Sequence, residues 1–202
     1  MTQRRPAVVV LAAGRGSRFR GAGHKLEQLL GDAPGGDTVL VRSLRHAIAT
    51  QLRVVVVTTA TLAPAAHRWV AARDVVVLPE RDAQGRPLPI GMGHSIVAGV
   101  GATGDADGWL ILPADMPLVR PATILAVAAG LERFPVCYAQ HRGMQGHPVG
   151  FGTELYSELM ALKGDEGARR IVARYAAQPI DVDDPGVHVD VDTAEDLARV
   201  RG

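Results

Sequence analysis

The strongest constraint on the fold of this chain is a set of short apolar runs with no polar residue inside them. The first, AVVVLAA over residues 7–13, ends at a glycine. A half-exposed strand would alternate apolar and polar residues, so an unbroken β-branched run predicts a strand buried on both faces, as in a parallel sheet. Further runs of this kind predict strands over residues 53–59, 74–79, 108–115 and 135–140.

Segments with apolar residues at helical spacing lie between and after these strands. Residues 38–50, for example, place Val39, Leu40 and Leu44 on one helical face. Other helices are predicted over residues 61–72, 94–102, 121–132, 153–162, 165–177 and 193–200. Strands that alternate with helices form βαβ units, so we expect an α/β fold of three layers, αβα, with a mostly parallel sheet. A chain of 202 residues is predicted to form a single domain, residues 1–202.

Composition is that of an ordinary globular protein, with 47% hydrophobic and 21% charged residues. The net charge of +1 gives no reason to expect a nucleic-acid partner. No segment approaches the roughly 18 apolar residues of a membrane span, and the short apolar run near the N-terminus does not have the pattern of a secretory signal. We therefore expect a cytoplasmic protein with no membrane partner. Cys137 is the only cysteine, which excludes an intramolecular disulfide.

Charge is divided unevenly along the chain. Residues 1–73 hold 11 Lys and Arg but only 3 Asp and Glu, whereas the rest of the chain holds 11 Lys and Arg and 18 Asp and Glu. This division suits a ligand that takes cations from one half and metal-binding carboxylates from the other. The alternative is a chance distribution of solvated charges.

A basic, glycine-rich loop, GRGSRFRGAGHK, follows the first predicted strand. Ligands of open α/β sheets bind beyond the carboxyl ends of the strands. Gly14 and Gly16 let the backbone approach a ligand and offer N–H groups to an anion, and Arg18 and Lys25 are among the cations that the loop adds. We therefore expect a phosphate group here. The alternative is a tight turn without a ligand.

Two familiar phosphate-binding motifs do not fit this loop. The dinucleotide fingerprint requires a glycine where Phe19 stands, and the P-loop requires a glycine followed by Lys-Ser or Lys-Thr. The second predicted strand also ends in threonines, where dinucleotide-binding proteins have an acidic residue. A nicotinamide-dependent oxidoreductase is therefore disfavoured. It stays an alternative, as does a nucleotide-binding protein without turnover.

The segment LAAGRGSRF…K instead resembles the L-A-A-G-x-G-x-R-(x)n-K signature of nucleotidyltransferases that activate sugars, cofactors and alcohol phosphates. The resemblance implies their Rossmann-like fold, with the glycine-rich loop around the triphosphate of a nucleotide. It also implies that Arg18 and Lys25 are catalytic, because they stabilise charge during transfer. The nucleotide-binding residues that it implies in this segment are Leu11, Ala12, Ala13, Gly14, Gly16, Ser17, Arg18 and Lys25.

Asp115 is the first candidate metal ligand, and it is also assigned as catalytic. It ends the predicted strand ILPAD, at the same sheet edge as Gly14. A carboxylate that faces a phosphate needs a counter-cation, and Mg²⁺ is the usual one. The alternative is a turn aspartate before Pro117, held by local hydrogen bonds.

Asp192 is the second candidate metal ligand. It directly precedes a helix that we expect to begin at Thr193, because Thr193 and Asp196 have the spacing of a capping box. The late metal ligand of the resembling superfamily also stands just before a helix. Asp190 shares a face with Asp192 in this extended segment, so it is the alternative ligand.

The segment GMGHSIVAGV is a second glycine-punctuated entry to a helix. In the resembling enzymes this segment contacts the base and ribose, which makes Gly91, Met92 and Ser95 nucleotide-binding candidates. The alternative is a plain helix cap formed by Ser95 or Gly93.

Further motifs narrow the resemblance. TVLVRSL, GMGHS, LPADMP, GHPV, GDEGAR and DVDTAEDL follow in the order found in MocA-like cytidylyltransferases, within the MobA/MocA-like NTP transferase family. The resemblance implies transfer of CMP from CTP to the terminal phosphate of molybdenum-loaded molybdopterin, with Mg²⁺ or Mn²⁺. It also implies transient contact with a molybdoenzyme or its chaperone. Ala13 favours CTP, since guanylyl-transferring relatives usually read L-A-G-G. GTP, or another phosphorylated acceptor, stays an alternative.

Three residues of the second half are candidates for binding the acceptor: His147, Asp165 and Arg169. Each has a structural alternative. His147 and Pro148 would fix a turn, Asp165 would cap a helix, and Arg169 would be an ordinary surface residue. No general base is expected, because a phosphomonoester with a second pKa of about 6 is already ionised near neutral pH.

Overall fold

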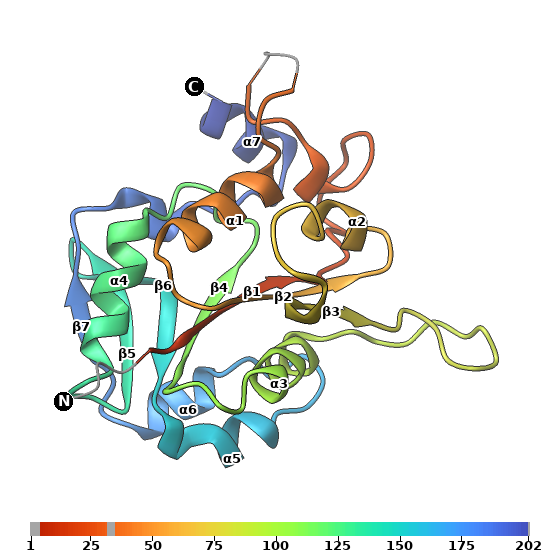
Figure 1. The fold of residues 1–202 in the computed structure, drawn as a ribbon. Helices are drawn as coiled ribbons and strands as arrows, with labels where there is room; N and C mark the ends of the chain where they lie inside the picture. Colours follow the sequence, from red (N-terminus) through yellow and green to blue (C-terminus); the bar gives the residue numbers. More distant parts are fainter. Residues whose placement is uncertain (1–4, 32–34, 202) are drawn as a thin grey trace.

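The computed structural model describes residues 5–31 and 35–201, so both ends of the predicted 1–202 domain lie outside the described residues. Seven strands form one sheet in the order β3-β2-β1-β4-β6-β5-β7 (Figure 1). All pairings are parallel except those of β6, which is antiparallel to both neighbours. The strands are β1 Ala7–Ala12, β2 Val54–Thr59, β3 Val75–Leu78, β4 Trp109–Pro113, β5 Val136–His141, β6 Met144–Phe151 and β7 Gln178–Asp181.

Helices cover both faces of the sheet, as the predicted αβα layering requires. Figure 1 shows α1 and α4 on one face and α3, α5 and α6 on the other. The α-helices are α1 Val39–Ala49, α2 Ala63–Ala66, α3 Met92–Ala102, α4 Pro121–Gly130, α5 Tyr156–Met160, α6 Arg169–Arg174 and α7 Ala194–Arg201. Short 3₁₀ helices are η1 Lys25–Glu27, η2 Ala72–Asp74, η3 Thr153–Leu155 and η4 Pro185–His188. No helix among the described residues is long and apolar enough to cross a membrane.

The alternation of side chains along β1 explains why its sequence is apolar throughout. Val8 and Val10 belong to the core cluster that also contains residues of α1 and α4, whereas Val9 belongs to the cluster that contains residues of α3 and α5. All three valines are fully buried, and each contributes on the order of 1.5–3 kcal/mol through burial. A Cβ on Gly99 of α3 would lie 2.3 Å from Val9, so glycine lets α3 rest on the sheet.

Several predicted elements need correction. The helix predicted over residues 61–72 is wrong beyond Ala66, because the N–H groups of Trp69 and Val70 both bond to the Ala66 carbonyl and end α2 in a turn. The helix predicted from residue 165 begins at Arg169. Strands β6 and β7 were not predicted. Glycines and a proline interrupt the apolar pattern of β6, and β7, with the sequence QPID, is short and contains a proline and two polar residues.

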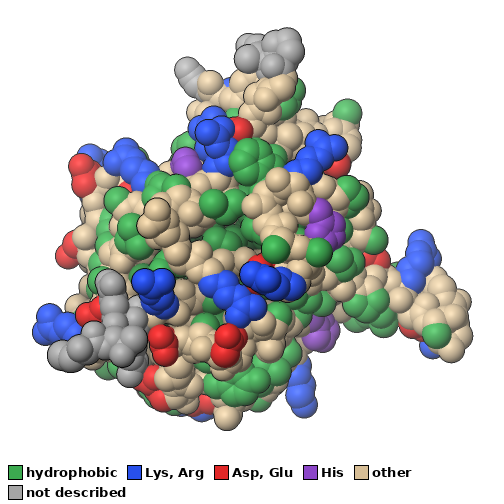
Figure 2. Space-filling model, viewed as in Figure 1, with side chains coloured by type: hydrophobic (Ala, Val, Ile, Leu, Met, Phe, Trp, Pro, Cys, Tyr) green, Lys and Arg blue, Asp and Glu red, His purple; other side chains and the backbone are tan. Residues whose placement is uncertain are grey.

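The connection between β3 and α3 contains a hairpin that stands out from the body of the molecule, at the right of Figures 1 and 2. Its arms are joined by hydrogen bonds from Leu88 N–H to the Glu80 carbonyl and from Asp82 N–H to the Arg86 carbonyl. The Arg15 side chain donates a 2.7 Å hydrogen bond to the Leu88 carbonyl. The base of the hairpin is therefore tied to the glycine-rich loop.

Candidate active site

A cleft of about 570 Å³ opens beyond the carboxyl ends of β1 and β4. This is the edge at which ligands of open α/β sheets bind. The glycine-rich loop, the residues after β4, part of β6 and the segment before α7 line the cleft. Of the residues predicted from sequence, it is lined by Leu11, Gly14, Gly16, Ser17, Arg18, Lys25, Met92, Asp115, His147 and Asp192.

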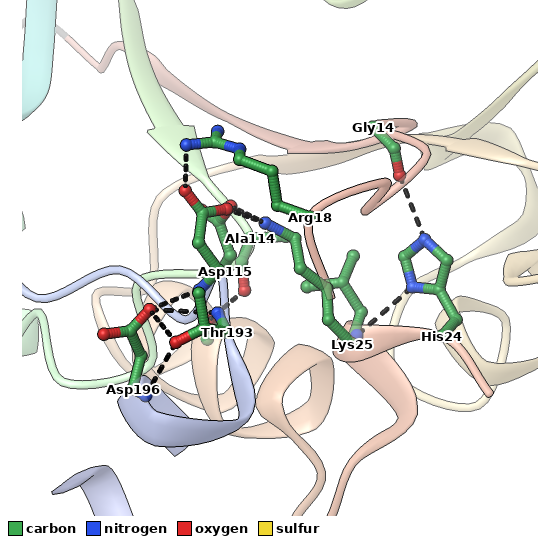
Figure 3. Close-up of polar contacts among 11 residues, drawn as sticks. Gly14, Arg18, His24, Lys25, Ala114, Asp115, Thr193 and Asp196 are labelled. Atoms are coloured by element: carbon green, nitrogen blue, oxygen red, sulfur yellow. Dashed lines mark hydrogen bonds and ion pairs between the residues drawn. The ribbon is translucent and has the colours of Figure 1, made fainter. Parts of the chain in front are cut away.

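Four charged side chains meet in this cleft, and we call them the cleft cluster: Arg18, Lys25, Asp115 and Asp192. The Lys25 Nζ atom lies 2.5 Å from Asp115 Oδ2 and 2.7 Å from Asp192 Oδ1. Arg18 Nη1 lies 2.8 Å from the other carboxylate oxygen of Asp192. Figure 3 shows Arg18 and Lys25 reaching this point from the glycine-rich segment. Asp115 is therefore an ion-pair partner of the loop.

Burial affects the charge state of Lys25, whose side chain is 8% exposed. Burial alone would lower the pKa of Lys25, but the charges and hydrogen bonds of Asp115 and Asp192 outweigh it and raise the pKa. Lys25 is therefore a cation at neutral pH. One ammonium group compensates two carboxylates that would otherwise repel each other.

Three consecutive residues of the loop that line the cleft have backbone donors without a partner in the described chain. The backbone N–H groups of Arg15, Gly16 and Ser17 make no hydrogen bond to any part of the chain that the structure describes. Gly16 has a φ of +59°, and a Cβ there would lie 3.3 Å from Lys25 Cγ. Glycine therefore allows the loop both its left-handed turn and its close approach to Lys25. Consecutive free N–H groups beside cations form an anion-binding concavity.

The predicted capping box of α7 fixes Asp192. Thr193 Oγ1 accepts a hydrogen bond from Asp196 N–H at 3.1 Å, and Asp196 Oδ2 accepts one from Thr193 N–H at 2.9 Å. The N–H of Val191 donates to the Asp115 carbonyl, which joins the segment to the residues after β4. Asp192 is thus held opposite Asp115 from both sides of its segment.

Asp190 also lines the cleft, but it has a different environment. Burial, together with the negative charges of Asp192 and Asp115, raises the pKa of its carboxyl group. Lys25 and Arg18 contact Asp192 and not Asp190. Of the two late aspartates, Asp192 is therefore the one directed at the cationic loop.

The donor set of the cleft cluster fits a magnesium-like ion. Oxygens of Asp115 and Asp192 already converge on one cation, the Lys25 ammonium. Among residues 5–31 and 35–201 no group of three or more potential ligands surrounds a common point. Mg²⁺ is usually bound by one or two carboxylates together with substrate phosphates and water, so two carboxylates are sufficient.

The candidates near α3 divide into two groups. Met92 is half exposed and lines the cleft. Ser95 is buried and does not line the cleft; its hydroxyl oxygen lies 3.4 Å from the Gly91 carbonyl oxygen. The α3 cap is Gly91, which corrects the alternative of Ser95 or Gly93. A Cβ on Gly91 would lie 2.2 Å from the Gly164 carbonyl oxygen, so this glycine is required by packing. Ala12 and Ala13 are likewise buried beneath the loop.

A second cavity, of about 690 Å³, adjoins the first and contains all three acceptor candidates, His147, Asp165 and Arg169. Met92, Gln145, Gly146 and His147 line both cavities. The turn alternative for His147 is wrong, because His147 and Pro148 lie within β6. The cap alternative for Asp165 is also wrong, because the N-cap of α6 is Ala168.

His147 lies between the charges of the two cavities. Burial lowers the pKa of its imidazole; the charge of Asp115 raises that pKa, and the charge of Arg169 lowers it. His147 is therefore neutral at pH 7. Sequence reasoning did not identify Gln145, which lines both cavities; its position directly before the GHPV motif was the available signal.

Comparisons with known proteins agree with this geometry. Residues 8–179 match the MobA-like NTP transferase domain family. The purine catabolism protein PucB of Bacillus subtilis is 35% identical over 117 residues, which cover 55% of this chain and 56% of PucB. The alignment thus spans little more than half the length of PucB.

Solved structures share the whole fold. The crystal structure of Rv0371c from Mycobacterium tuberculosis H37Rv has a TM-score of 0.77 and 26% identity, covering 99% of both chains. A complex of Rv0371c with manganese has a TM-score of 0.73 and 25% identity, covering 97% of both chains. The predicted α/β fold and the family resemblance are therefore confirmed. With residues 8–179 matched and its glycine-rich loop at the expected sheet edge, this chain belongs to the MobA-like NTP transferase family.

Proposed function

We propose that this nucleotidyltransferase transfers CMP from CTP to the terminal phosphate of a molybdopterin-type acceptor and releases pyrophosphate. The observation that carries the proposal is the cleft cluster, in which Lys25 and Arg18 contact Asp115 and Asp192 beside a loop with free N–H groups. Cations and N–H donors suit a triphosphate, and paired carboxylates suit the metal that accompanies it.

The chain's own residues bind and orient the nucleotide. The loop around Gly14 and Gly16, together with Arg18, holds the β- and γ-phosphates. Lys25 leaves the two carboxylates for the α-phosphate, where its ammonium stabilises the charge that develops during transfer. Asp115 and Asp192 would hold a Mg²⁺ or Mn²⁺ ion, which neutralises phosphate charge when bound.

The reaction is an in-line displacement at phosphorus. An oxygen of the acceptor's terminal phosphate forms a bond to the α-phosphorus, the bond from that phosphorus to the bridging oxygen breaks, and pyrophosphate leaves with the electron pair. The nucleophile is already ionised near neutral pH, so no side chain has to remove a proton. Catalysis therefore rests on positioning and charge stabilisation.

The second cavity is the proposed acceptor site. Its floor is apolar, with Ile96, Ile111 and Val149 among its lining residues, and Asp165 and Arg169 supply charged groups. His147 lines both cavities, so an acceptor held there can direct its phosphate past His147 toward Asp115. A neutral imidazole at this point can donate a hydrogen bond to that phosphate.

The base assignment rests on Ala13, which favours CTP over GTP by resemblance. Ala13 is buried beneath the loop, so it would act by shaping the backbone near the nucleotide. A cytoplasmic location and a transient contact with a recipient molybdoenzyme or its chaperone complete the proposal. Transfer of GMP, or transfer to another phosphorylated acceptor, is the alternative within the same family.

The test is pyrophosphate release with Mg²⁺ and molybdenum-loaded molybdopterin, with CTP, GTP, ATP and UTP supplied separately. We expect release with CTP alone. Release with GTP instead would contradict the base assignment and preserve the mechanism. Silence with all four nucleotides, in protein that still binds Mg-NTP, would contradict the acceptor. An Asp115→Asn variant measures the background rate.

A further inference from the structure

One side chain joins the two ends of the glycine-rich loop without lining the cleft. His24 Nδ1 accepts a 3.2 Å hydrogen bond from Leu26 N–H, at the start of η1. His24 Nε2 lies 3.0 Å from the Gly14 carbonyl oxygen. Figure 3 shows the His24 ring between Gly14 and the segment that begins with Lys25. The ring therefore bridges the beginning and the end of the loop.

These contacts define the tautomer of His24. Because Nδ1 accepts from a backbone N–H, it carries no proton, and the proton of the neutral ring is on Nε2. Nε2–H then donates to the Gly14 carbonyl. Both ring nitrogens are used by the backbone of the loop, so neither is available to a substrate.

The bond to Gly14 sets the direction of a peptide group. In a trans peptide the C=O and the following N–H point in opposite directions. A Gly14 carbonyl held toward His24 therefore turns the N–H of Arg15 away from His24. That N–H is one of the three consecutive free donors at residues 15–17, and Gly14 and Arg15 both line the cleft, whereas His24 does not.

The space beside Gly14 is open: among the described residues, no atom lies within 4 Å of the position that a Cβ on Gly14 would occupy. If the peptide flipped, it would present a carbonyl oxygen to the anion site. The same ring also caps η1, whose first residue is Lys25, so it orients the catalytic lysine as well as the N–H donors.

We propose that His24 is a positioning residue, which holds the glycine-rich loop in the conformation that accepts the triphosphate. This inference rests on the proposed function, because it takes a nucleotide as the ligand of the loop. His24 touches neither substrate nor metal in this proposal; it acts through the Gly14 peptide and through Lys25.

The test compares binding of inorganic tripolyphosphate and of Mg-CTP by the wild-type chain and by three variants. His24→Ala removes both hydrogen bonds. His24→Asn keeps a short acceptor for the N–H two residues on and an amide donor, so it is the conservative variant. His67→Ala is the control, because His67 is an exposed histidine at the end of α2.

We expect His24→Ala to lower the affinity for both ligands by about tenfold, the effect of losing one hydrogen bond to a charged group. The nucleotide KM should rise, while the acceptor KM stays unchanged. His24→Asn should recover most of the affinity, and His67→Ala should match the wild type. Thermal unfolding of each variant reports whether it is folded.

Two outcomes overturn the inference, and they differ in what they leave standing. If the wild type binds both ligands and His24→Ala binds them equally well, the positioning role is wrong and the proposed function survives. If the wild type binds neither tripolyphosphate nor any NTP, both are wrong. Should His24→Ala fail to fold, ¹⁵N NMR of the wild type decides: a His24 ring protonated on Nδ1 contradicts the inference, and one protonated on Nε2 supports it.

Discussion

Two clusters of ion pairs in this molecule have similar composition and different construction. In the cleft cluster Lys25 and Arg18 pair with Asp115 and Asp192. In a second cluster, at the start of α1, Asp37 pairs with Arg42 and Arg45 at 2.8 and 3.0 Å. We call the second set the α1 cluster. Burial alone would raise the pKa of Asp37, but the hydrogen bonds and charges of Arg42 and Arg45 outweigh it and lower the pKa.

The clusters differ in sequence separation and in exposure. The partners of Asp37 are 5 and 8 residues away, whereas Lys25 is 90 and 167 residues from its two aspartates. The side chains of Arg42 and Arg45 are 39% and 56% exposed, against 8% for Lys25. The α1 cluster thus forms from local sequence and supports a helix N-terminus. The cleft cluster forms only once the fold has assembled, as a functional site does.

The largest predicted difference between the clusters concerns turnover. Asp115→Asn and Lys25→Met should each reduce pyrophosphate release by about 10²-fold or more, the scale observed when an electrostatic stabiliser is removed. Asp37→Asn should leave the rate unchanged, because the α1 cluster does not line the cleft. The measurement is the initial rate of pyrophosphate release by each variant at saturating CTP and acceptor. Near-full turnover by Asp115→Asn would remove Asp115 from the mechanism.

The next effect concerns metal binding in the absence of nucleotide. The Lys25 ammonium contacts the two carboxylates that would hold a metal ion, so we expect it to compete with the ion. Lys25→Met should increase the affinity for Mn²⁺ alone by about tenfold, equivalent to about 1.4 kcal/mol. Electron paramagnetic resonance of free Mn²⁺ measures this directly.

Arg42→Met is the matched control for that experiment, since it removes a cation from the α1 cluster and should leave Mn²⁺ affinity unchanged. Equal affinities in wild type and Lys25→Met would show that Lys25 does not compete with the metal. Chelation of the metal with EDTA should abolish turnover in the wild type.

The parts of this architecture that were predicted from sequence are those with local signals. The buried runs that became β1, β2 and β4 are unbroken and apolar, and the Thr193–Asp196 capping box is a local pattern. The strand β6 carries Gly146, Pro148 and Gly150, so its apolar pattern is interrupted, and its burial depends on β4 and β5 on either side. Tertiary context outweighed local pattern there.

The candidate site divides in the same way. The LAAG…K motif identified Lys25 and Arg18, but no pattern indicates that Lys25 bridges Asp115 and Asp192, because that contact depends on three distant segments. Gly91 of GMGHS was interpreted as a nucleotide contact, and Gly93 as an alternative helix cap. Both glycines pack against the backbone of residues 163–166, a requirement visible only in three dimensions.

We expect a smaller difference between the two clusters in their contribution to the free energy of unfolding. Lys25→Met leaves two partly buried carboxylates without their shared cation, and we expect it to lower the free energy of unfolding by about 2 kcal/mol, below the roughly 3–5 kcal/mol of fully buried pairs. Asp37→Asn should cost about 0.5–1 kcal/mol, as for exposed pairs, and the cost should shrink with added salt. Urea unfolding at low and high salt tests both. Equal losses of unfolding free energy in Lys25→Met and Asp37→Asn would mean that burial does not make the cleft cluster more important for stability than the α1 cluster.

The smallest effect measures how far the field of the cleft cluster extends. The negative charge of Asp115 favours the protonated form of His147, so it raises the pKa of an imidazole that burial lowers. Removing that charge in Asp115→Asn should therefore lower the His147 pKa further, whereas Asp37→Asn should leave it unchanged. Titration of the His147 ring by NMR compares the three proteins. An unchanged or higher His147 pKa in Asp115→Asn would show that the charge of Asp115 does not act on His147, and the proposed path of the acceptor phosphate between the cavities would lose its support.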